Sequence, residues 1–384
     1  MGWHQVTRRP TIAIDASNIH SGGALQVATS VIDEIGKLSR TGDHPWHWLN
    51  SVHIYASTHI TAALPQAIKG NRVTVINRRP MNQISHFHHP GRHADVTLTL
   101  FGPTYYPCAT GVQIVGFADG TSLFPERTPD KRKPTTAKAR IRAAYAQHYF
   151  SNVDHIVVES PHAASGLQAR WNIPRERITV IPNVLNQSLS KPTARRHSIN
   201  GNILRLAYPA RLHPHKNFAI LGQAASILSR QESPIRVEYA LTLTDSEWDR
   251  VDPVTRAYSV NFGPQATPSI GRVYEQSDGV VFPSLNEMFS ATPLEAHHYQ
   301  LPLLASDRDF VRHNSGPAAL YFDPHSPQDL AQAIQTLFQA SERDIAALTT
   351  KGKAIIDRWP TAKDRAVMYL TTIHDLIPNT GEQR

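Results

Sequence analysis

The sequence has a single cysteine, no long apolar run and no repeat at a fixed period. Cys108 is the only cysteine in 384 residues, which excludes an internal disulfide framework and favours a reducing compartment. Nowhere do about 18 apolar residues follow one another, and residues 1–10 lack the apolar core of a signal peptide. We therefore expect a cytoplasmic protein that is neither exported nor membrane-spanning. The absence of a repeat argues against solenoids and propellers.

The chain is long enough for two domains of typical size, and two domains imply a cleft. Its 39 lysines and arginines exceed its 31 aspartates and glutamates and give a formal net charge of +8. A positive charge favours an anionic partner such as nucleic acid, anionic lipid or a phosphorylated substrate.

Short apolar runs alternate with helical patterns in both halves of the chain. The first unit of this kind is the run at 11–15, the glycine turn with Gly22 and Gly23, and a helical pattern over 25–38. Such alternation predicts two doubly wound, Rossmann-like α/β domains. We place an N-terminal domain at 1–200, a C-terminal domain at 201–357, and a terminal helix at 358–384 that packs back on the first domain.

Two glutamates, Glu287 and Glu295, stand on either side of a predicted helix start. Thr292 suits the N-cap and Pro293 the first helical position, and a helix N-terminus attracts a phosphate or diphosphate. Carboxylates beside it suit hydroxyl-rich groups. A nucleotide sugar has this layout, because its diphosphate lies between a ribose and a hexose. Two simpler interpretations stay open: Glu295 fits a Thr-x-x-Glu capping box, and Glu287 fits an exposed loop carboxylate.

A basic loop follows the first predicted strand of the C-terminal domain. Arg211 and Lys216 lie in YPARLHPHKN, where a strand leads into a helix and where ligands bind in open α/β sheets. Two cations at that edge suit a diphosphate, although a basic loop also fits a solvated surface.

In this order, the segments YPARLHPHKN and FPSLNEMFSATPLEA resemble family 4 of the retaining glycosyltransferases, the group 1 glycosyltransferases. The similarity covers about residues 95–340, with a weaker match at the glycine turn. It implies the GT-B fold, in which two Rossmann-like domains face a central cleft. It also implies a nucleoside-diphosphate sugar as donor substrate, no cofactor and no metal.

The resemblance implies a role for each matching position. Arg211 and Lys216 hold the donor diphosphate and neutralise its charge, Glu287 lies near the transferred sugar, and Glu295 bonds the ribose hydroxyls. We assign catalysis to Arg211, Lys216 and Glu287. Further donor contacts are expected from Gly22, Gly23, Phe289, Ser290, Ala291 and Thr292.

The sequence departs from the family pattern at two places. Met288 stands where a glycine is common after the first glutamate. The family's His-Asp pair appears here as Ala118 and Asp119, so Asp119 is assigned to the sugar or acceptor side without its histidine. The missing histidine motivates a non-catalytic binding subunit as one alternative.

Two further groups resemble metal sites. Asp307-Arg308-Asp309 fits an Asp-x-Asp metal motif, but GT-B enzymes as a class need no such metal. The histidines of the other group lack the i, i+4 pairing and acidic partner of a zinc site and fit an exposed loop or the acceptor side: His86, His88, His89 and His93.

The densest basic stretch runs into a predicted helix and consists of Lys131, Arg132, Lys133, Lys138, Arg140 and Arg142. It fits a solvated face or, alternatively, peripheral docking on an anionic membrane surface. Nucleic acid is not expected, because the basic residues are not interleaved with stacking aromatics.

The sequence therefore predicts a retaining hexosyltransferase-type enzyme that moves a sugar from a nucleotide sugar to a glycan or lipid-linked acceptor. The expected setting is the synthesis of cell-surface polysaccharide or lipopolysaccharide at the inner face of the membrane. A non-hydrolysing nucleotide-sugar epimerase and a non-catalytic GT-B binding subunit remain as alternatives.

Overall fold

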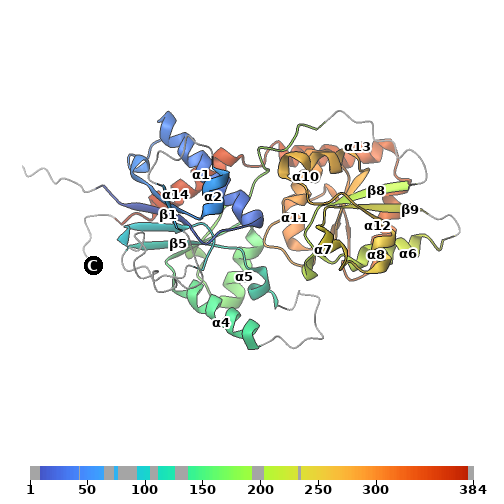
Figure 1. Cartoon of the computed structure of the whole chain (residues 1–384), viewed down its shortest axis with the longest axis horizontal. Coiled ribbons are helices and arrows are strands. Elements are labelled where there is room, and N and C mark those ends of the chain that lie inside the picture. The colour runs from blue at the N-terminus through green and yellow to red at the C-terminus, as the bar shows by residue number, and fades with distance from the viewer. Residues whose placement is uncertain are drawn as a thin grey trace, which may run out of the picture. The chain divides into compact units, whose positions relative to one another are not determined.

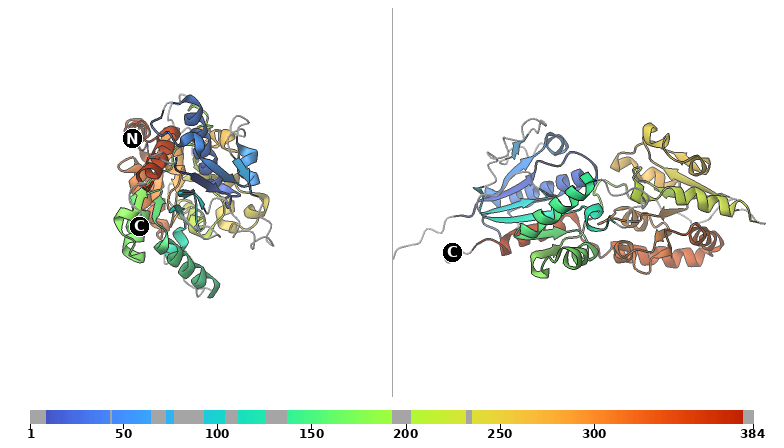
Figure 2. Two further views of the ribbon diagram at one scale, coloured as in Figure 1. Left: turned by 90° about the vertical axis from the view of Figure 1, so that its left-hand side faces the viewer. Right: turned by 90° about the horizontal axis from the view of Figure 1, so that it is seen from below.

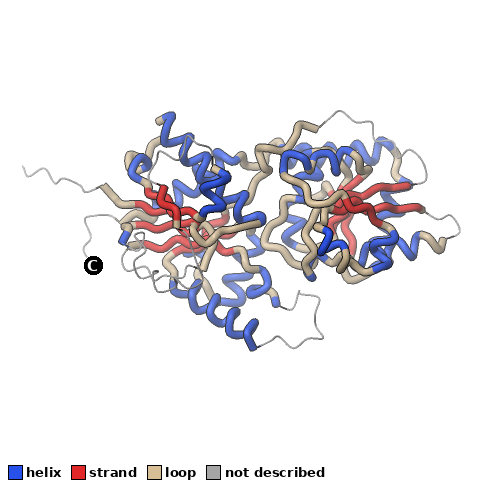
Figure 3. The backbone as a smooth tube through the Cα atoms, in the orientation of Figure 1, coloured by secondary structure: helices blue, strands red, loops and turns tan. Residues whose placement is uncertain are grey.

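A computed structural model describes residues 9–42, 44–64, 73–76, 93–103, 111–125, 137–192, 203–231 and 235–378. The packing divides the chain into two compact units. Unit 1 comprises Met1–Ser122, Ala137–Asn183 and Pro360–Arg384, and unit 2 comprises Leu123–Thr136 and Val184–Trp359. In each unit the strands lie inside and the helices surround them (Figure 3). The predicted domain bounds at 200 and 357 stay a prediction.

Unit 1 is built on a seven-stranded parallel sheet of order β3-β2-β1-β4-β5-β6-β7. All residues of β1, β4 and β6 are buried, as expected for a parallel sheet that is covered on both faces. The strands are β1 (Ile12–Ala16), β2 (His53–Ala56), β3 (Val73–Val75), β4 (Val96–Thr99), β5 (Val112–Phe117), β6 (His155–Val158) and β7 (Ile178–Val180).

The helices of unit 1 cover this sheet. They are α1 (Gly22–Thr41), α2 (Thr58–Ala63), α3 (Gly120–Leu123), α4 (Ala137–Asn152), α5 (Pro161–Trp171) and α14 (Ala362–Asp375). Helix α14, from the C-terminal end of the chain, packs on α1 (Figure 1). Its buried Tyr369, Leu370 and Ile373 join the core that contains Val31 and Ile35 of α1. Figure 2 shows the same red helix beside the blue N-terminal elements.

Unit 2 has a six-stranded parallel sheet of order β10-β9-β8-β11-β12-β13. The strands are β8 (Ile203–Tyr208), β9 (Arg236–Leu241), β10 (Ser259–Asn261), β11 (Gly279–Phe282), β12 (Leu303–Ser306) and β13 (Ala319–Phe322). The chain first builds β8, β9 and β10 in one direction and then returns to place β11 on the other side of β8. The strand order therefore reverses between β8 and β11, and such a switch point is where open α/β sheets bind ligands.

The helices of unit 2 are α6 (Ala219–Leu228), α7 (Asp245–Trp248), α8 (Pro253–Ala257), α9 (Gly271–Glu275), α10 (Thr292–His298), α11 (Asp309–Ser315), α12 (Pro327–Gln339) and α13 (Glu342–Ile356). Helices α6, α8 and α12 pack together, as do α10 and α13. Two parallel Rossmann-like sheets confirm the predicted α/β fold class.

None of the helices in the described part of the chain is long and apolar enough to cross a bilayer.

Candidate functional site

The predicted donor residues of unit 2 lie at the switch point of its sheet. Arg211 and Lys216 are in the loop that follows β8, and Glu287 is in the loop that follows β11. Because β8 and β11 are parallel neighbours, both loops leave the sheet at the same edge. Two segments about 70 residues apart are thus brought together.

Hydrogen bonds fasten these two loops to each other. The Leu285 N–H donates to the His215 carbonyl at 2.8 Å. The Asn217 side chain donates to the carbonyls of Pro283 at 3.3 Å and Pro324 at 2.8 Å. Asn217 adopts a left-handed backbone conformation, with φ of 57°, which asparagine tolerates better than most residues. The loop after β8 is therefore fixed against the loops after β11 and β13.

The fastening places Lys216 against Glu287. The Lys216 Nζ and the Glu287 Oε1 are 2.5 Å apart, and their side chains are only 15% and 12% exposed. The buried Tyr208 fixes the backbone at Lys216, because its hydroxyl donates to the Lys216 carbonyl at 2.8 Å. Glu287 is thus no solvated loop carboxylate, and the simpler interpretation of that residue is wrong.

Glu295 does not cap helix α10. The helix already begins at Thr292, and its N-cap is Ala291, with helical dihedrals and no side-chain hydrogen bond. The predicted N-cap at Thr292 and the capping-box alternative are therefore wrong, because the preceding turn has entered the helical conformation one residue early.

Glu295 instead accepts a hydrogen bond of 2.5 Å from the Tyr274 hydroxyl. Burial raises the pKa of this carboxyl, while the Tyr274 hydroxyl and the positive Lys216 act in the opposite direction. The Tyr274 ring stacks on Tyr299 with 4.9 Å between centroids, and the Tyr299 hydroxyl lies 3.0 Å from Ser190 Oγ. The position of Glu295 is thus set by a chain of buried aromatic side chains.

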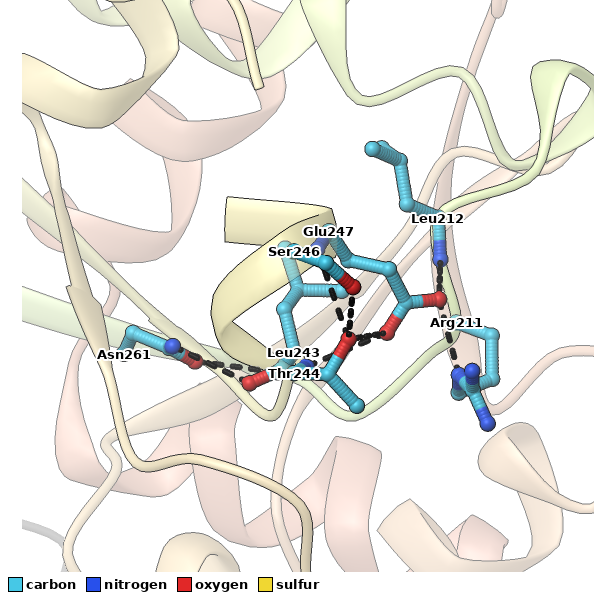
Figure 4. A network of polar contacts seen from close by, with 7 residues as sticks. All are labelled: Arg211, Leu212, Leu243, Thr244, Ser246, Glu247 and Asn261. Atoms are coloured by element: carbon cyan, nitrogen blue, oxygen red, sulfur yellow. Dashed lines mark hydrogen bonds and ion pairs between the residues drawn. The ribbon is translucent and has the colours of Figure 1, made fainter. Parts of the chain in front are cut away.

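Arg211 is paired with a different carboxylate, Glu247 of helix α7. The Arg211 Nε donates to Glu247 Oε1 at 2.8 Å, and the Leu212 N–H donates to the same oxygen at 3.1 Å (Figure 4). Burial alone would raise the pKa of Glu247, but hydrogen bonds from Arg211, Thr244 and Leu212 lower it to about 2. Glu247 is therefore an ionised carboxylate held in place on all sides.

The turn between the two predicted glutamates runs through Phe289, Ser290 and Ala291. Among the described residues, the backbone N–H groups of Ser290 and Ala291 find no acceptor. Ser290 is largely buried, and the ring of Phe289 lies 6.4 Å from Trp359. Met288, in place of the usual glycine, is itself buried in the unit. The turn thus offers two backbone donors to a ligand.

The remaining predicted residues belong to unit 1. Gly22 opens α1 with φ of +71°, a conformation that favours glycine, and a Cβ added to Gly22 or Gly23 would meet no described atom within 4 Å. Asp119 accepts hydrogen bonds from the N–H groups of Thr121 and Ser122, both at 3.1 Å. Its carboxylate thereby caps the short helix α3. The donor and sugar roles of these residues stay predictions.

The two groups that resemble metal sites in the sequence are the Asp307-Arg308-Asp309 motif and the histidines between 86 and 93. Asp307 forms a two-contact ion pair with Arg312, at 2.5 and 2.8 Å, and Asp309 starts α11. His93 is described, whereas His86, His88 and His89 lie outside the described residues. Within the described ranges, histidine, cysteine and acidic side chains form no group of three or more that could hold a metal ion.

The basic stretch is described only in part. Lys131, Arg132 and Lys133 lie outside the described residues, as does the side chain of Lys138. Arg140 and Arg142 are exposed on α4, and Arg142 approaches Asp119 at 3.4 Å.

Sequence reasoning missed Glu247, Tyr208 and Tyr274. Glu247 and Tyr274 lie in segments without a motif, and Tyr208 opens the YPARLHPHKN segment but carries no charge that would mark it. Each contacts a predicted residue from 8 to 36 positions away. The one local signal is the sequence Thr244-x-x-Glu247, which does form a capping box. That signal predicts the start of a helix and does not predict the contact between Glu247 and Arg211.

Comparison with known proteins gives a family match for the C-terminal half of the chain. The model of the family described as "Glycosyl transferases group 1" matches residues 204–340, which include the loops after β8 and β11. The O-antigen chain mannosyltransferase RfbU of Salmonella typhimurium is 25% identical over 193 residues, or 48% of this chain and 51% of that protein. A D-inositol 3-phosphate glycosyltransferase of Thermobispora bispora is 24% identical over 279 residues, or 66% and 64%. The alignments thus span about half to two thirds of these curated relatives.

Solved structures show the same fold over nearly the whole chain. HepE of Anabaena, solved in complex with UDP and glucose, has a TM-score of 0.66 at 16% identity and covers 96% of this chain and 100% of that one. The sucrose-phosphate synthase of Thermosynechococcus elongatus has a TM-score of 0.69 at 16% identity and covers 96% and 99%. The matched family model and these likenesses lead to one conclusion: residues 204–340 are a group 1 glycosyltransferase region similar to family 4, and the chain has the GT-B fold.

Proposed function

We propose that this protein is a retaining glycosyltransferase that moves a sugar from a nucleoside-diphosphate sugar to a glycan or lipid-linked acceptor. The observation that carries the proposal is the Lys216–Glu287 ion pair at the switch point of unit 2, with Arg211 in the same loop as Lys216. These residues fall within the matched family region. Two cations and two unpaired backbone donors at one sheet edge, all among the described residues, suit a diphosphate, and nearby carboxylates suit sugar hydroxyls.

In the proposed reaction the bond between the sugar anomeric carbon and the diphosphate oxygen breaks while the acceptor hydroxyl attacks the same face. The leaving diphosphate takes up the hydroxyl proton. Arg211 and Lys216 neutralise the negative charge that grows on the diphosphate, so electrostatic stabilisation is the main contribution of the protein. In this proposal Glu287, which pairs with Lys216, accepts hydrogen bonds from the transferred sugar, and Glu295 accepts them from the ribose.

The nucleotide and the sugar can be found by a thermal-shift screen. A ligand that binds only the folded state raises the unfolding temperature, so UDP-, GDP-, ADP- and dTDP-sugars are compared at equal concentration. We expect one nucleotide to raise it and the Arg211→Ala variant to lose that rise. A wild-type protein that responds to none of them would contradict the proposal. HepE, a structural neighbour, was solved with UDP-glucose, which makes UDP-glucose the first donor to try.

The two alternatives are separated by simple incubations. An epimerase would convert the sugar nucleotide in the absence of any acceptor, whereas a transferase forms a new glycoside only when an acceptor is present. A non-catalytic subunit would bind the donor and transfer nothing. The specific observation behind that last alternative is Ala118 in place of a histidine, next to an Asp119 that caps α3.

We propose in addition that helix α4 docks on an anionic membrane surface, at the inner face. Its exposed Ile141 (70%) and Tyr145 (48%) lie one turn apart, next to the exposed Arg140 and Arg142. Apolar and basic side chains together suit the boundary of an anionic bilayer. Flotation with vesicles that contain anionic lipid should carry the wild type upward and should fail for Ile141→Asp; absence of the wild type from the vesicle fraction would contradict docking.

A further inference from the structure

Glu247 is a buried carboxylate whose two oxygens are both fully used. Its side chain is 6% exposed. Oε1 accepts from the Arg211 Nε and the Leu212 N–H, as described above. Oε2 accepts from the Thr244 N–H at 3.1 Å and from the Thr244 hydroxyl at 3.0 Å (Figure 4). The same carboxylate thus joins the loop after β8 to the start of α7.

The start of α7 is anchored in turn to the sheet. The side-chain oxygen of Asn261, which ends β10, accepts from the Leu243 N–H at 2.9 Å, and its amide donates to the Leu243 carbonyl at 3.0 Å. Leu243 precedes Thr244, the N-cap of α7, so the start of the helix that carries Glu247 is fixed to the end of β10 (Figure 4). Glu247 therefore has a defined position from which to hold another side chain.

Arg211 is held at one edge of its guanidinium only. Its Nε donates to Glu247 Oε1, and the N–H of the next residue, Leu212, donates to the same oxygen. Among the described residues, no hydrogen bond or ion pair engages Nη1 or Nη2 of Arg211, and the side chain is 66% exposed. These two nitrogens form the fork that binds a phosphate with two parallel hydrogen bonds. Lys216 differs, because its single ammonium already meets Glu287.

We propose that Glu247 is a positioning residue of the donor site, which holds Arg211 by its Nε so that Nη1 and Nη2 stay available for the donor diphosphate. The inference rests on the proposed function. It assigns no direct contact between Glu247 and the donor, and Glu247 acts through Arg211 alone.

Electrostatics and positioning predict opposite results when Glu247 is removed. A carboxylate near a diphosphate repels it, so loss of the charge alone would strengthen binding. If Glu247 instead orders Arg211, loss of Glu247 leaves the long Arg211 side chain flexible. The donor must then order that side chain when it binds, and the entropy cost weakens binding. The direction of the change in affinity therefore decides between the two.

The test is a calorimetric titration of the full chain with UDP, GDP and ADP in turn. We expect Glu247→Ala to bind the preferred nucleotide at least tenfold more weakly than the wild type, equivalent to about 1.4 kcal/mol. The matched control is Asp252→Ala, which loses the side-chain cap of helix α8 in the same unit and removes no bond of Glu247 or Arg211; its affinity should stay within about twofold of the wild type. Should Glu247→Ala fail to fold, Glu247→Gln is measured, and we expect a change in the same direction.

A double-mutant cycle with Arg211 completes the test. In the Arg211→Ala background, Glu247→Ala should change the affinity little, because the side chain that it holds is gone. Equal or tighter binding by Glu247→Ala, an equal loss in Asp252→Ala, or an undiminished effect in the Arg211→Ala background would each overturn the inference while leaving the proposed function intact. A wild type that binds none of the three nucleotides would overturn the proposed function, and the inference with it.

Discussion

The partly buried pair of Lys216 and Glu287 allows a stability prediction with a defined size. At an effective dielectric constant of about 20, two unit charges at the observed 2.5 Å attract each other by about 7 kcal/mol. Desolvation of two ions offsets most of that attraction, so the pair as a whole adds little to stability. Removal of one partner is different, because the other charge stays buried without compensation, at a cost of about 3–5 kcal/mol.

The perturbation is a double-mutant cycle with Lys216→Met and Glu287→Gln, which keep the approximate shapes. We expect each single variant to be destabilised by about 3 kcal/mol and the double variant by much less than the sum, a coupling of about 2 kcal/mol or more. For a unit of this size, about 3 kcal/mol corresponds to roughly 6–12 °C in unfolding temperature. The assay is thermal unfolding followed by calorimetry.

The chain offers a matched control for this cycle. Lys353 and Asp357 form an ion pair of 2.6 Å, with side chains that are 54% and 57% exposed. Lys353→Met should change stability by well under 1 kcal/mol, because exposed pairs of the same length contribute little. Additive single effects of less than about 1 kcal/mol at Lys216 and Glu287 would refute the reasoning, since the pair would then behave like the exposed one.

Three further predictions concern other described residues. Burial lowers the pKa of His297 to about 4; because the unfolded chain takes up this proton near pH 6.5, stability should be complete above that pH and fall by about 3 kcal/mol in total towards pH 4. Urea unfolding at pH 7.5 and 5 should show a larger fall in the free energy of unfolding for the wild type than for His297→Gln. Equal pH dependence of the two proteins would contradict the prediction. Tyr274→Phe removes the hydroxyl that donates to Glu295 and should weaken nucleotide binding by about 3–10-fold, measured by titration; unchanged affinity would show that this bond does not set the position of the carboxylate. Gly222→Ala would place a Cβ 2.5 Å from the Thr255 nitrogen and should destabilise the protein by about 1–3 kcal/mol, whereas the same stability as Gly23→Ala, which meets no described neighbour, would contradict the packing of α6 on α8.

Local patterns were sufficient for much of the fold. The apolar run at 11–15 predicted β1 to within one residue, and the helical pattern over 25–38 falls inside α1, because strands buried on both faces are rich in apolar residues. Helix α13 was not predicted. Its buried positions are Ile345, Thr349 and Gly352, so only one of three is apolar and the helical period is hidden. Gly352 is required there because its Cβ would lie 2.5 Å from His297, a contact that the sequence does not reveal.

The site was predictable as a set of residues but not as a set of contacts. Arg211, Lys216 and Glu287 stand out by charge and by their place after predicted strands. That Lys216 pairs with Glu287 and Arg211 with Glu247 depends on the order of the strands, which brings together segments 36 to 71 residues apart. Local propensity also misplaced the start of α10, since Thr292 is a good N-cap by type but lies inside the helix.

Turnover at saturating donor tests the central claim most directly, because it asks whether the cations at the β8–β11 switch point stabilise the departing diphosphate. Arg211→Ala and Lys216→Ala should each lower the rate of nucleoside diphosphate release by about 100-fold or more, by analogy with the loss of one oxyanion donor. The control Arg205→Ala removes a cation that pairs with Glu238, in the middle of β8 rather than in the loop that follows it, and should keep near-normal turnover per folded molecule. Near-normal turnover in Arg211→Ala or Lys216→Ala would contradict the assignment of the donor site.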